Sequence, residues 1–157
     1  MSISLTPKED DPHLEYILQA INAQIKPIYL TIEAEQDSAL QDCVNIVERK
    51  VKTCGGQAIF GWQIWRLPFL FEAEFHCVWE TPEGTLKDIS PKPSSDTRIL
   101  FVEDDNLKYE GKQINSVRFN LTPNKLVDDY IAITDTIFQF SNKGDLAYQH
   151  GLITLRG

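Results

Sequence analysis

The sequence predicts an α+β domain, in which an antiparallel β-sheet is covered by an N-terminal helix that carries a cysteine and by a C-terminal helix. Three observations support this class. Two helical patterns come first, a series of strand-like segments follows, and a long amphipathic pattern comes after them. The 157 residues suit one domain with a core that needs no disulfides. We expect residues 1–10 to be flexible, a functional core at about 37–102 and the C-terminal helix at about 123–142.

The first third of the chain predicts two helices with a strand between them. Pro12 suits the first position of a helix of roughly 13 residues, whose apolar residues recur at helical spacing up to Ile25. Residues 28–32 are rich in β-formers. Asp42 is a good N-cap for the second helix, which Gly55 ends. An alternative start at Asp37 or Ser38 remains open.

A β-hairpin in the middle of the chain is the most informative pattern. Residues 71–80 alternate in polarity, and the turn from Thr81 to Thr85 has Pro at its second position and Gly before its end. If Thr81 faces Thr85, paired residue numbers sum to 166. His76 then lies diagonal to Asp88 on one face, with Cβ atoms within about 8 Å. A slip of one residue would separate them.

The remaining segments complete the sheet and add the last helix. Residues 57–66 predict a strand, in which Gly61 marks a bulge or a close backbone approach, and residues 98–102 predict a compact apolar strand. Residues 108–120 predict one or two short strands. After Thr122 and Pro123, a helix is expected to bury one stripe, made of Leu126, Val127, Tyr130, Ile131, Thr134, Ile137 and Phe138.

Composition limits the classes of partner. The formal net charge of -8 argues against a nucleic acid or an anionic membrane as partner. The N-terminus has no signal-peptide pattern and no apolar run spans a bilayer, so we expect a soluble, cytoplasmic protein, with delivery into another cell left open. The three cysteines and three histidines show neither a disulfide framework nor metal-ligand spacing. No cofactor and no metal are therefore expected.

Three residues fit the requirements of thiol catalysis. Cys43 would occupy the first position of its helix, where unpaired backbone N–H groups and the helix dipole favour a thiolate. His76 could accept its proton, and Asp88 could orient the imidazole. The order of a thiol at a helix start, then a His and an Asp on adjacent strands, indicates a Cys-His-Asp triad.

The residues around this triad resemble the papain-like and transglutaminase-like superfamily. The segment His76-Cys77-Val78-Trp79-Glu80 is similar to the family's H-x-W-x-E strand, with the Trp one place later, and Lys87-Asp88-Ile89-Ser90-Pro91 is similar to its D-x-[ST]-P ending. The chain lacks a Trp beside the cysteine and is shorter than most members. The resemblance implies an acyl-enzyme reaction on amide bonds of a protein or peptide: glutamine deamidation, proteolysis or transglutamination. It also suggests a bacterial effector or toxin. It also implies that the Cys43 N–H and a preceding glutamine, Gln36 or Gln41, form the oxyanion hole. Trp62 and Trp65 could line a substrate groove.

Simpler interpretations stand beside this one. Cys43 shares a helix face with Val47 and Cys54, so it could be a buried small side chain. His76 follows Glu72 and Glu74 on its face, which could be a solvated strand face. The competing class is a non-catalytic interaction module, such as an immunity or adaptor protein. Cys54 is a weaker nucleophile candidate, because the dipole at a helix C-terminus opposes a thiolate.

Overall fold

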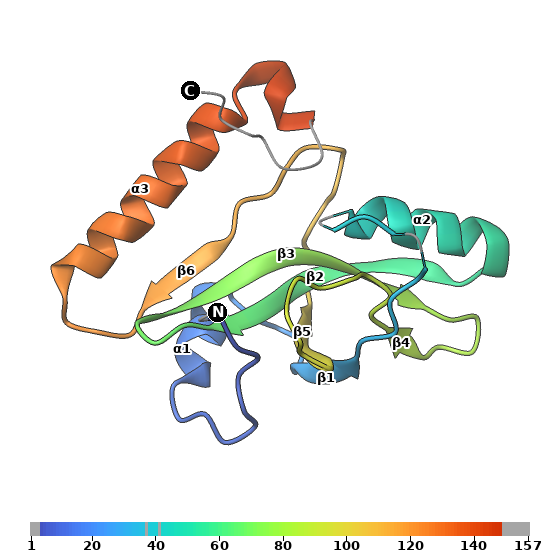
Figure 1. The fold of residues 1–157 in the computed structure, drawn as a ribbon, viewed down its shortest axis with the longest axis horizontal. Helices are drawn as coiled ribbons and strands as arrows, with labels where there is room; N and C mark the ends of the chain where they lie inside the picture. Colours follow the sequence, from blue (N-terminus) through green and yellow to red (C-terminus); the bar gives the residue numbers. More distant parts are fainter. Residues whose placement is uncertain (1–3, 37, 41, 149–157) are drawn as a thin grey trace.

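The computed structural model describes residues 4–36, 38–40 and 42–148. The helices and strands follow one another in the order α1 (Leu14–Ala20), β1 (Ile28–Thr31), α2 (Cys43–Cys54), β2 (Gln57–Arg66), β3 (Leu70–Glu80), β4 (Leu86–Lys87), β5 (Arg98–Glu103), β6 (Val117–Asn120), α3 (Lys125–Ser141) and the 3₁₀-helix η1 (Gly144–Tyr148). The α+β class is confirmed, with helices before and after an antiparallel strand series (Figure 1).

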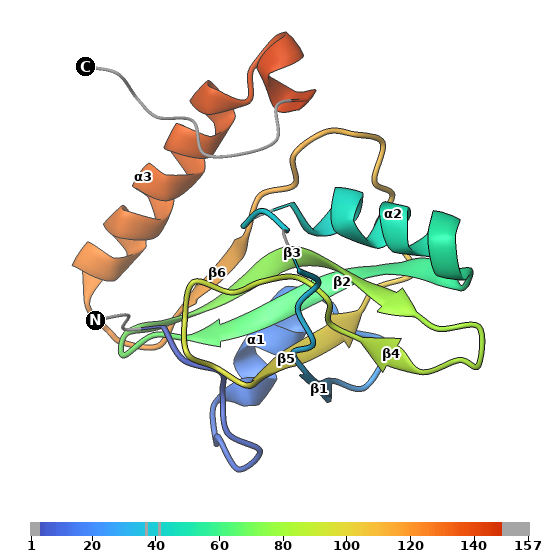
Figure 2. The same ribbon diagram turned by 45° about the vertical axis from the view of Figure 1, so that its right-hand side comes forward.

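The sheet is nearly closed on itself. Its strands lie in the order β1-β5-β2-β3-β4, every neighbouring pair is antiparallel, and β6 pairs with the first part of β3. An isolated parallel bridge between Ile32 and Asp88 joins the two ends of this order. Figure 2 shows the strands bent around a common interior. The bend brings the segment after β4 beside the segment after β1, so residues that belong to opposite sheet edges become neighbours.

Gly61 allows β2 and β5 to approach each other. A Cβ atom at this position would lie 2.2 Å from the backbone oxygen of Val102. Such a contact is far inside van der Waals distance, and backbone atoms cannot move aside cheaply. The predicted close backbone approach at Gly61 is therefore confirmed, and it lies opposite His76 in the β2–β3 register.

The two faces of the sheet have different partners. Opposite residues of an antiparallel pair share a face, and the face that includes Cys77 is covered by the helices. One cluster there surrounds Ile17 of α1 and another surrounds Val47 of α2. The other face, which includes His76 by register, contains a separate apolar cluster of Leu30, Val78, Ile99 and Phe101. His76 therefore points toward the interior of the bent sheet.

The predicted hairpin register is confirmed. Trp79 pairs with Lys87 and Glu80 with Leu86, so that paired numbers sum to 166. Within the turn, the Thr81 N–H donates to the Thr85 carbonyl at 2.8 Å, and Gly84 has φ 86°. The glycine supplies the left-handed conformation that closes a three-residue loop. The second strand is shorter than expected.

One other expectation is corrected. Helix α1 has 7 residues rather than roughly 13, because Asn22 adopts a left-handed φ of 52° directly after the helix end. Residues 108–120 contain one short strand, β6, in agreement with the prediction of one or two, and the segment before it is a loop. The strands predicted at residues 28–32, 57–66 and 98–102 are present as β1, β2 and β5.

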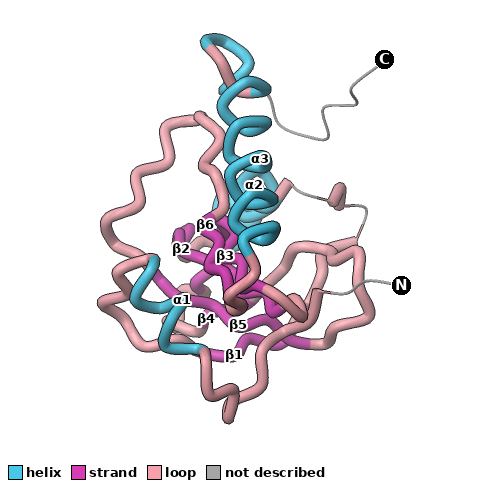
Figure 3. The backbone as a smooth tube through the Cα atoms, turned by 90° about the vertical axis from the view of Figure 1, so that its left-hand side faces the viewer, coloured by secondary structure: helices cyan, strands magenta, loops and turns pink. Residues whose placement is uncertain are grey.

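Helix α3 projects away from the sheet (Figure 3). It begins after Asn124, whose side chain accepts a hydrogen bond from the Leu126 N–H at 3.0 Å, rather than at Thr122 and Pro123. The prediction that its apolar stripe is buried is wrong, since no residue of α3 is buried and Leu126, Tyr130 and Ile137 are exposed. None of the helices in the described residues is long and apolar enough to cross a bilayer.

Candidate active site

Cys43 is the first residue of α2, at the helix start that its sequence predicts. Asp42 is the N-cap residue, but its carboxylate accepts from the Asn45 side-chain amide at 2.6 Å and makes no capping bond to the backbone. The thiol is half-buried. It packs against the cluster that surrounds Val47. The side chain is thus held against the sheet but is not sealed inside it.

The Cys43 thiol lies beside His76 at a stretch of the β3 edge that is not paired with another described strand. β6 pairs with β3 at residues 70–73, and β4 pairs with it at residues 79–80. Among the described strands, none pairs with the edge between them. There His76 and the Cys77 backbone lie beside the Cys43 sulfur and lower the pKa of its thiol. The unpaired stretch of β3 therefore lets the helix start meet a side chain from the opposite face.

Asp88 holds the other side of the imidazole. Its Oδ1 lies 3.0 Å from His76 Nε2 and also accepts from the Ser90 N–H at 3.3 Å. His76 is 4% exposed and Asp88 is fully buried. Because Nε2 faces the Asp88 carboxylate, Nδ1 is the ring nitrogen of His76 that is available to interact with the Cys43 sulfur. The structure brings Cys43, His76 and Asp88 together in that order.

Lys92 is a fourth member of this group, and sequence reasoning missed it. Its side chain is 7% exposed, and its Nζ lies 2.9 Å from Asp88 Oδ2. Nζ is also 3.2 Å from Gln63 Oε1 and 3.3 Å from His76 Nε2. The sequence predicts only a connecting loop at Pro91-Lys92-Pro93, because no hydrophobic pattern there indicates that the lysine is buried. The bend of the sheet brings it to the carboxylate.

These charges shift the pKa values of all three residues of the row. Burial and Lys92 oppose the protonation of His76, but the hydrogen bonds to Asp88 and Cys43 and the Asp88 charge outweigh them and raise its pKa to about 9. Burial opposes the Cys43 thiolate, yet the His76 hydrogen bond, the Cys77 N–H and Lys92 hold its pKa below that of a free thiol. The pKa of Asp88 is lowered against burial by His76 and Lys92. The two shifts act in the same direction, toward a thiolate beside an imidazolium.

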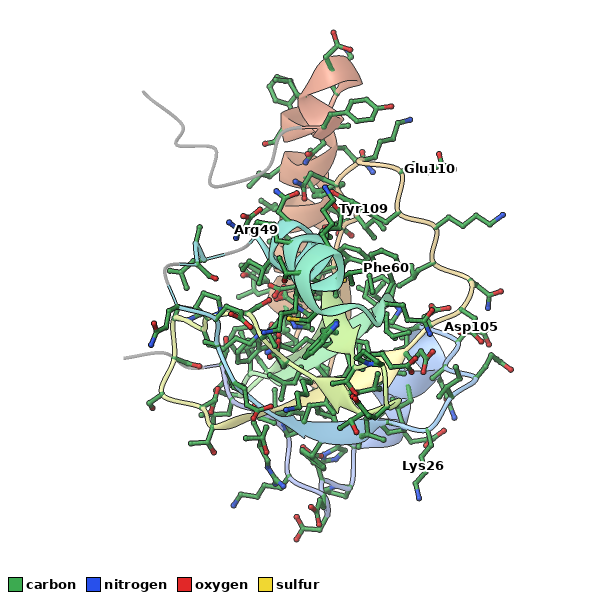
Figure 4. The ribbon with its side chains drawn as sticks, turned by 90° about the vertical axis from the view of Figure 1, so that its right-hand side faces the viewer. Lys26, Arg49, Phe60, Asp105, Tyr109 and Glu110 are labelled. Atoms are coloured by element: carbon green, nitrogen blue, oxygen red, sulfur yellow. The ribbon has the colours of Figure 1, made fainter. Side chains whose placement is uncertain are left out.

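Aromatic side chains other than the predicted ones lie beside the thiol. Tyr109 stacks on Phe75 with ring centroids 5.4 Å apart, and Phe60 lies 6.0 Å from Phe75. All three are partly buried and pack with Cys43 against the same cluster. Figure 4 shows Phe60 and Tyr109 next to α2. Tyr109 comes from the loop after β5, so no local pattern relates it to the cysteine.

The predicted tryptophan groove is corrected. Trp62 is 6% exposed and donates to Asp104 Oδ2 at 3.1 Å, and it belongs to the cluster under α1. Trp65 is 9% exposed. Neither ring presents a face to solvent. The alternating pattern correctly predicts that both tryptophans lie in a strand. The same pattern occurs for residues of a core and of a groove, so it does not distinguish the two.

The predicted oxyanion-hole glutamines and the other two cysteines differ from Cys43 in their positions. Gln36 is exposed in the loop before α2, next to Glu35, whose N–H donates to the Ile89 carbonyl at 3.0 Å. Gln41 lies outside the described residues. Cys54 is exposed at the far end of α2, whereas burial raises the pKa of the fully buried Cys77. Cys43 is thus the one cysteine of the three that contacts a histidine.

Other features of the described surface do not add to the site. Two open hollows are lined by α1 with residues 22–27 and by β6 with the start of α3, and neither includes Cys43. No three His, Cys, Asp or Glu side chains of the described residues are grouped as a metal ion would require.

No family model matches the chain, and neither a curated protein nor a solved structure is significantly similar to it. The geometry of the site therefore carries the functional argument alone.

Proposed function

We propose that the protein is a thiol-dependent hydrolase or acyltransferase acting on amide bonds of a protein or peptide. One observation carries the proposal: His76 hydrogen-bonds the buried Asp88 at 3.0 Å, and the same imidazole lies beside the half-buried Cys43 thiol and lowers its pKa. A nucleophile, a base and a group that orients the base are the parts that covalent acyl transfer requires. The papain-like and transglutaminase-like superfamily is the class that this row and its strand context resemble.

The reaction follows from the charge state of the row. The Cys43 thiolate attacks the amide carbonyl carbon, and the negative charge on the oxygen is met by the Cys43 backbone N–H at the start of α2. The His76 imidazolium gives its proton to the leaving nitrogen as the C–N bond breaks, which releases ammonia or an amine and leaves a thioester. Neutral His76 then takes a proton from water or from a second amine, which attacks the thioester and restores the thiolate.

The surroundings of the sulfur favour a macromolecular substrate. The thiol lies at a sheet edge, in the same cluster as Phe60, Phe75 and Tyr109. A small substrate is normally held in a concave pocket, whereas a protein segment can lie across an open edge. The aromatic side chains would then contact the substrate beside the reactive bond.

The thiol itself provides the test. Full-length protein is alkylated with iodoacetamide at about pH 6, and each cysteine is followed by mass spectrometry. We expect Cys43 to react fast and Cys54, at the other end of α2, to serve as the internal reference for an exposed thiol. In His76→Ala, the Cys43 rate should fall roughly 100-fold, because burial then disfavours the thiolate. Equal rates at Cys43 and Cys54 would leave the alternative, a non-catalytic interaction module.

The substrate class needs a second measurement. The protein is incubated with glutamine-rich proteins, with and without a fluorescent primary amine, and the products are analysed for ammonia, peptide cleavage and amine incorporation. Each product identifies one branch of the same thioester. Cys43→Ala is the matched control and should abolish all three products.

A further inference from the structure

The outer edge of β3 is unpaired between two short neighbouring strands. β6 pairs with residues 70–73 of β3 and β4 pairs with residues 79–80, at its two ends (Figure 1). Of the described strands, none pairs with this edge at residues 74–78, a stretch that we call the β3 gap. The opposite edge is paired with β2 over residues 71–80. At about 3.4 Å per residue, the gap measures roughly 20 Å between the two flanking strands, which is enough for a short extended segment.

The backbone directions along β3 are set by its regular pairing. In an antiparallel strand, the N–H and C=O groups of alternate residues point to opposite edges. On the β2 side, the Leu67 N–H donates to the Leu70 carbonyl at 2.9 Å, and on the β4 side the Thr81 N–H donates to the Thr85 carbonyl at 2.8 Å. The β2–β3 register between these two bonds is unbroken. Even-numbered residues of β3 therefore face β2, and odd-numbered residues face the outer edge.

Phe75 and Cys77 are the odd-numbered residues within the β3 gap. Among the described residues, none forms a backbone hydrogen bond with Phe75 on this edge. The Cys77 backbone lies beside the Cys43 sulfur. Phe75 thus offers one N–H and one C=O at the edge, and the next residue that faces the same way lies at the reactive thiol. Unpaired backbone groups on a sheet edge are the groups that bind an added β-strand.

Side chains on the α2 side of the gap form an apolar surface around Phe75. Its ring stacks on Tyr109 at 5.4 Å and lies 6.0 Å from the Phe60 ring, and all three pack against the cluster that also includes Cys43 and Cys77. Directly opposite residues of an antiparallel pair share a face. A residue paired with Phe75 would therefore place its side chain against these rings, which favours a large apolar side chain. A residue paired with Cys77 would place its side chain on the face where α2 presents the thiol.

We propose that an extended segment of the substrate adds to the β3 gap as a strand antiparallel to β3. A carboxamide side chain, glutamine or asparagine, lies opposite Cys77, and a large apolar residue two positions later lies opposite Phe75. The direction follows from the neighbours: β4 and β6 both run antiparallel to β3, so a segment between them continues their line. This inference rests on the proposed function, because it places the substrate at the same sulfur. It selects the side-chain amide reactions over peptide cleavage.

The added strand makes a defined set of backbone contacts. The substrate residue opposite Phe75 donates its N–H to the Phe75 carbonyl and accepts from the Phe75 N–H, as in any hydrogen-bonded antiparallel pair. The substrate residue before it, opposite His76, points its N–H away from β3. At Cys77 the ladder ends, because the Cys43 sulfur lies beside that backbone. Two hydrogen bonds at Phe75 thus hold the segment while the carboxamide meets the thiolate.

Seven-residue peptides test the arrangement. Each carries a chloroacetamide on the side chain of its fourth residue, in place of the carboxamide, and the thiolate displaces chloride as the C–S bond forms. Full-length protein is incubated with each peptide at about pH 6, and modification of Cys43 is followed by mass spectrometry. With phenylalanine at the sixth residue, we expect alkylation roughly 10-fold faster than with alanine there. In Tyr109→Ala this advantage should shrink. Faster alkylation with phenylalanine at the second residue would mean parallel addition and overturns the proposal.

Backbone methylation of the peptides tests the hydrogen bonds. N-methylation of the sixth residue removes the N–H that reaches the Phe75 carbonyl and should cancel most of the roughly 10-fold gain. N-methylation of the fifth residue is the matched control, because its N–H points away from β3. Equal rates for the two methylated peptides overturn strand addition.

Iodoacetamide separates this inference from the proposed function. If Cys43 reacts fast with iodoacetamide but at one rate with all the peptides, strand addition alone is overturned. If Cys43 reacts slowly with iodoacetamide and with every peptide, the proposed function is overturned as well.

Discussion

His76 Nε2 and Asp88 Oδ1 lie 3.0 Å apart inside a nearly closed sheet. His76 belongs to β3, and Asp88 directly follows β4, which a three-residue turn joins to β3. The short hairpin fixes their relative register, because each residue added to the turn would move one side chain to the other face. The pair also lies beside the start of α2, which comes from an earlier part of the chain, and contacts Lys92, which follows Asp88 by four residues. Its chemical properties thus depend on both local and distant neighbours.

The Asp88→Asn variant removes the negative charge of this pair while it preserves the hydrogen bond. The amide can still accept from His76 Nε2, but the negative charge that favours the imidazolium is lost. We expect the His76 pKa to fall and the alkylation of Cys43 at about pH 6 to slow by roughly 10- to 100-fold. Asp88→Ala removes the hydrogen bond as well and should slow it further. Equal rates in wild type and Asp88→Asn would mean that the carboxylate does not support the thiolate.

The buried ion pair between Asp88 and Lys92 predicts strong coupling in stability. Their charged atoms are 2.9 Å apart, and both side chains are almost completely buried. Removing one partner leaves the other charge buried and unpaired, which costs about 3–5 kcal/mol. We expect Asp88→Asn and Lys92→Met each to lower the free energy of unfolding in urea by that order, and the double variant to lose less than the two losses together. Simple additivity would contradict the pairing.

Lys92 also limits the basicity of His76. Its ammonium is 3.3 Å from Nε2 and opposes a second positive charge on the ring. In Lys92→Met the pKa of His76 should therefore rise above its value of about 9, whereas Lys92→Arg, which keeps the charge, should leave it nearly unchanged. NMR titration of the imidazole protons measures the shift. A lower pKa in Lys92→Met would show that Lys92 acts on His76 chiefly by holding Asp88 in place.

The pKa shifts also predict a pH range for the thiolate-imidazolium pair. The lowered pKa of Cys43 means that its thiolate forms below the pH at which a free thiol ionises. The raised pKa of His76 keeps the ring protonated up to about pH 9. Ultraviolet absorbance of the thiolate, taken as wild type minus Cys43→Ser, should appear with a midpoint below about pH 8.5. Acyl transfer that needs the imidazolium as an acid should decline above about pH 9. A midpoint at or above that of a free thiol would exclude the ion pair.

Gly61→Ala tests the closure of the sheet behind His76. The new Cβ would lie 2.2 Å from the Val102 oxygen and 2.8 Å from the Phe101 ring, so β2 and β5 would have to separate. We expect a loss of at least about 3 kcal/mol in the free energy of unfolding. Gly84→Ala is the control. Its Cβ meets nothing within 4 Å, and only its φ of 86° is strained, which costs about 1–2 kcal/mol. Similar losses in both variants would argue against a steric role for Gly61.

Local patterns were sufficient where neighbouring residues decide the structure. The Thr81–Thr85 turn sets the register that places His76 near Asp88, since a three-residue loop with Gly84 allows only one pairing. Asp42 and Gly55 bound the helix that begins with Cys43. These interactions span a few residues, so the sequence alone predicts them.

The long-range contacts were decided by the tertiary fold. Lys92 reaches Gln63 on β2 because the bent sheet brings its segment inward, and Tyr109 stacks on Phe75 from a loop whose own pattern is weak. The orientation of α3 is the clearest case. Apolar spacing on a helix shows which side chains need a partner, but only the arrangement of the whole chain shows that Leu126 and Phe140 have none within the described fold. By itself the sequence determined which elements form and which residues share a face, because those depend on backbone geometry. Which faces meet depends on packing between distant segments, and only the tertiary structure decided it.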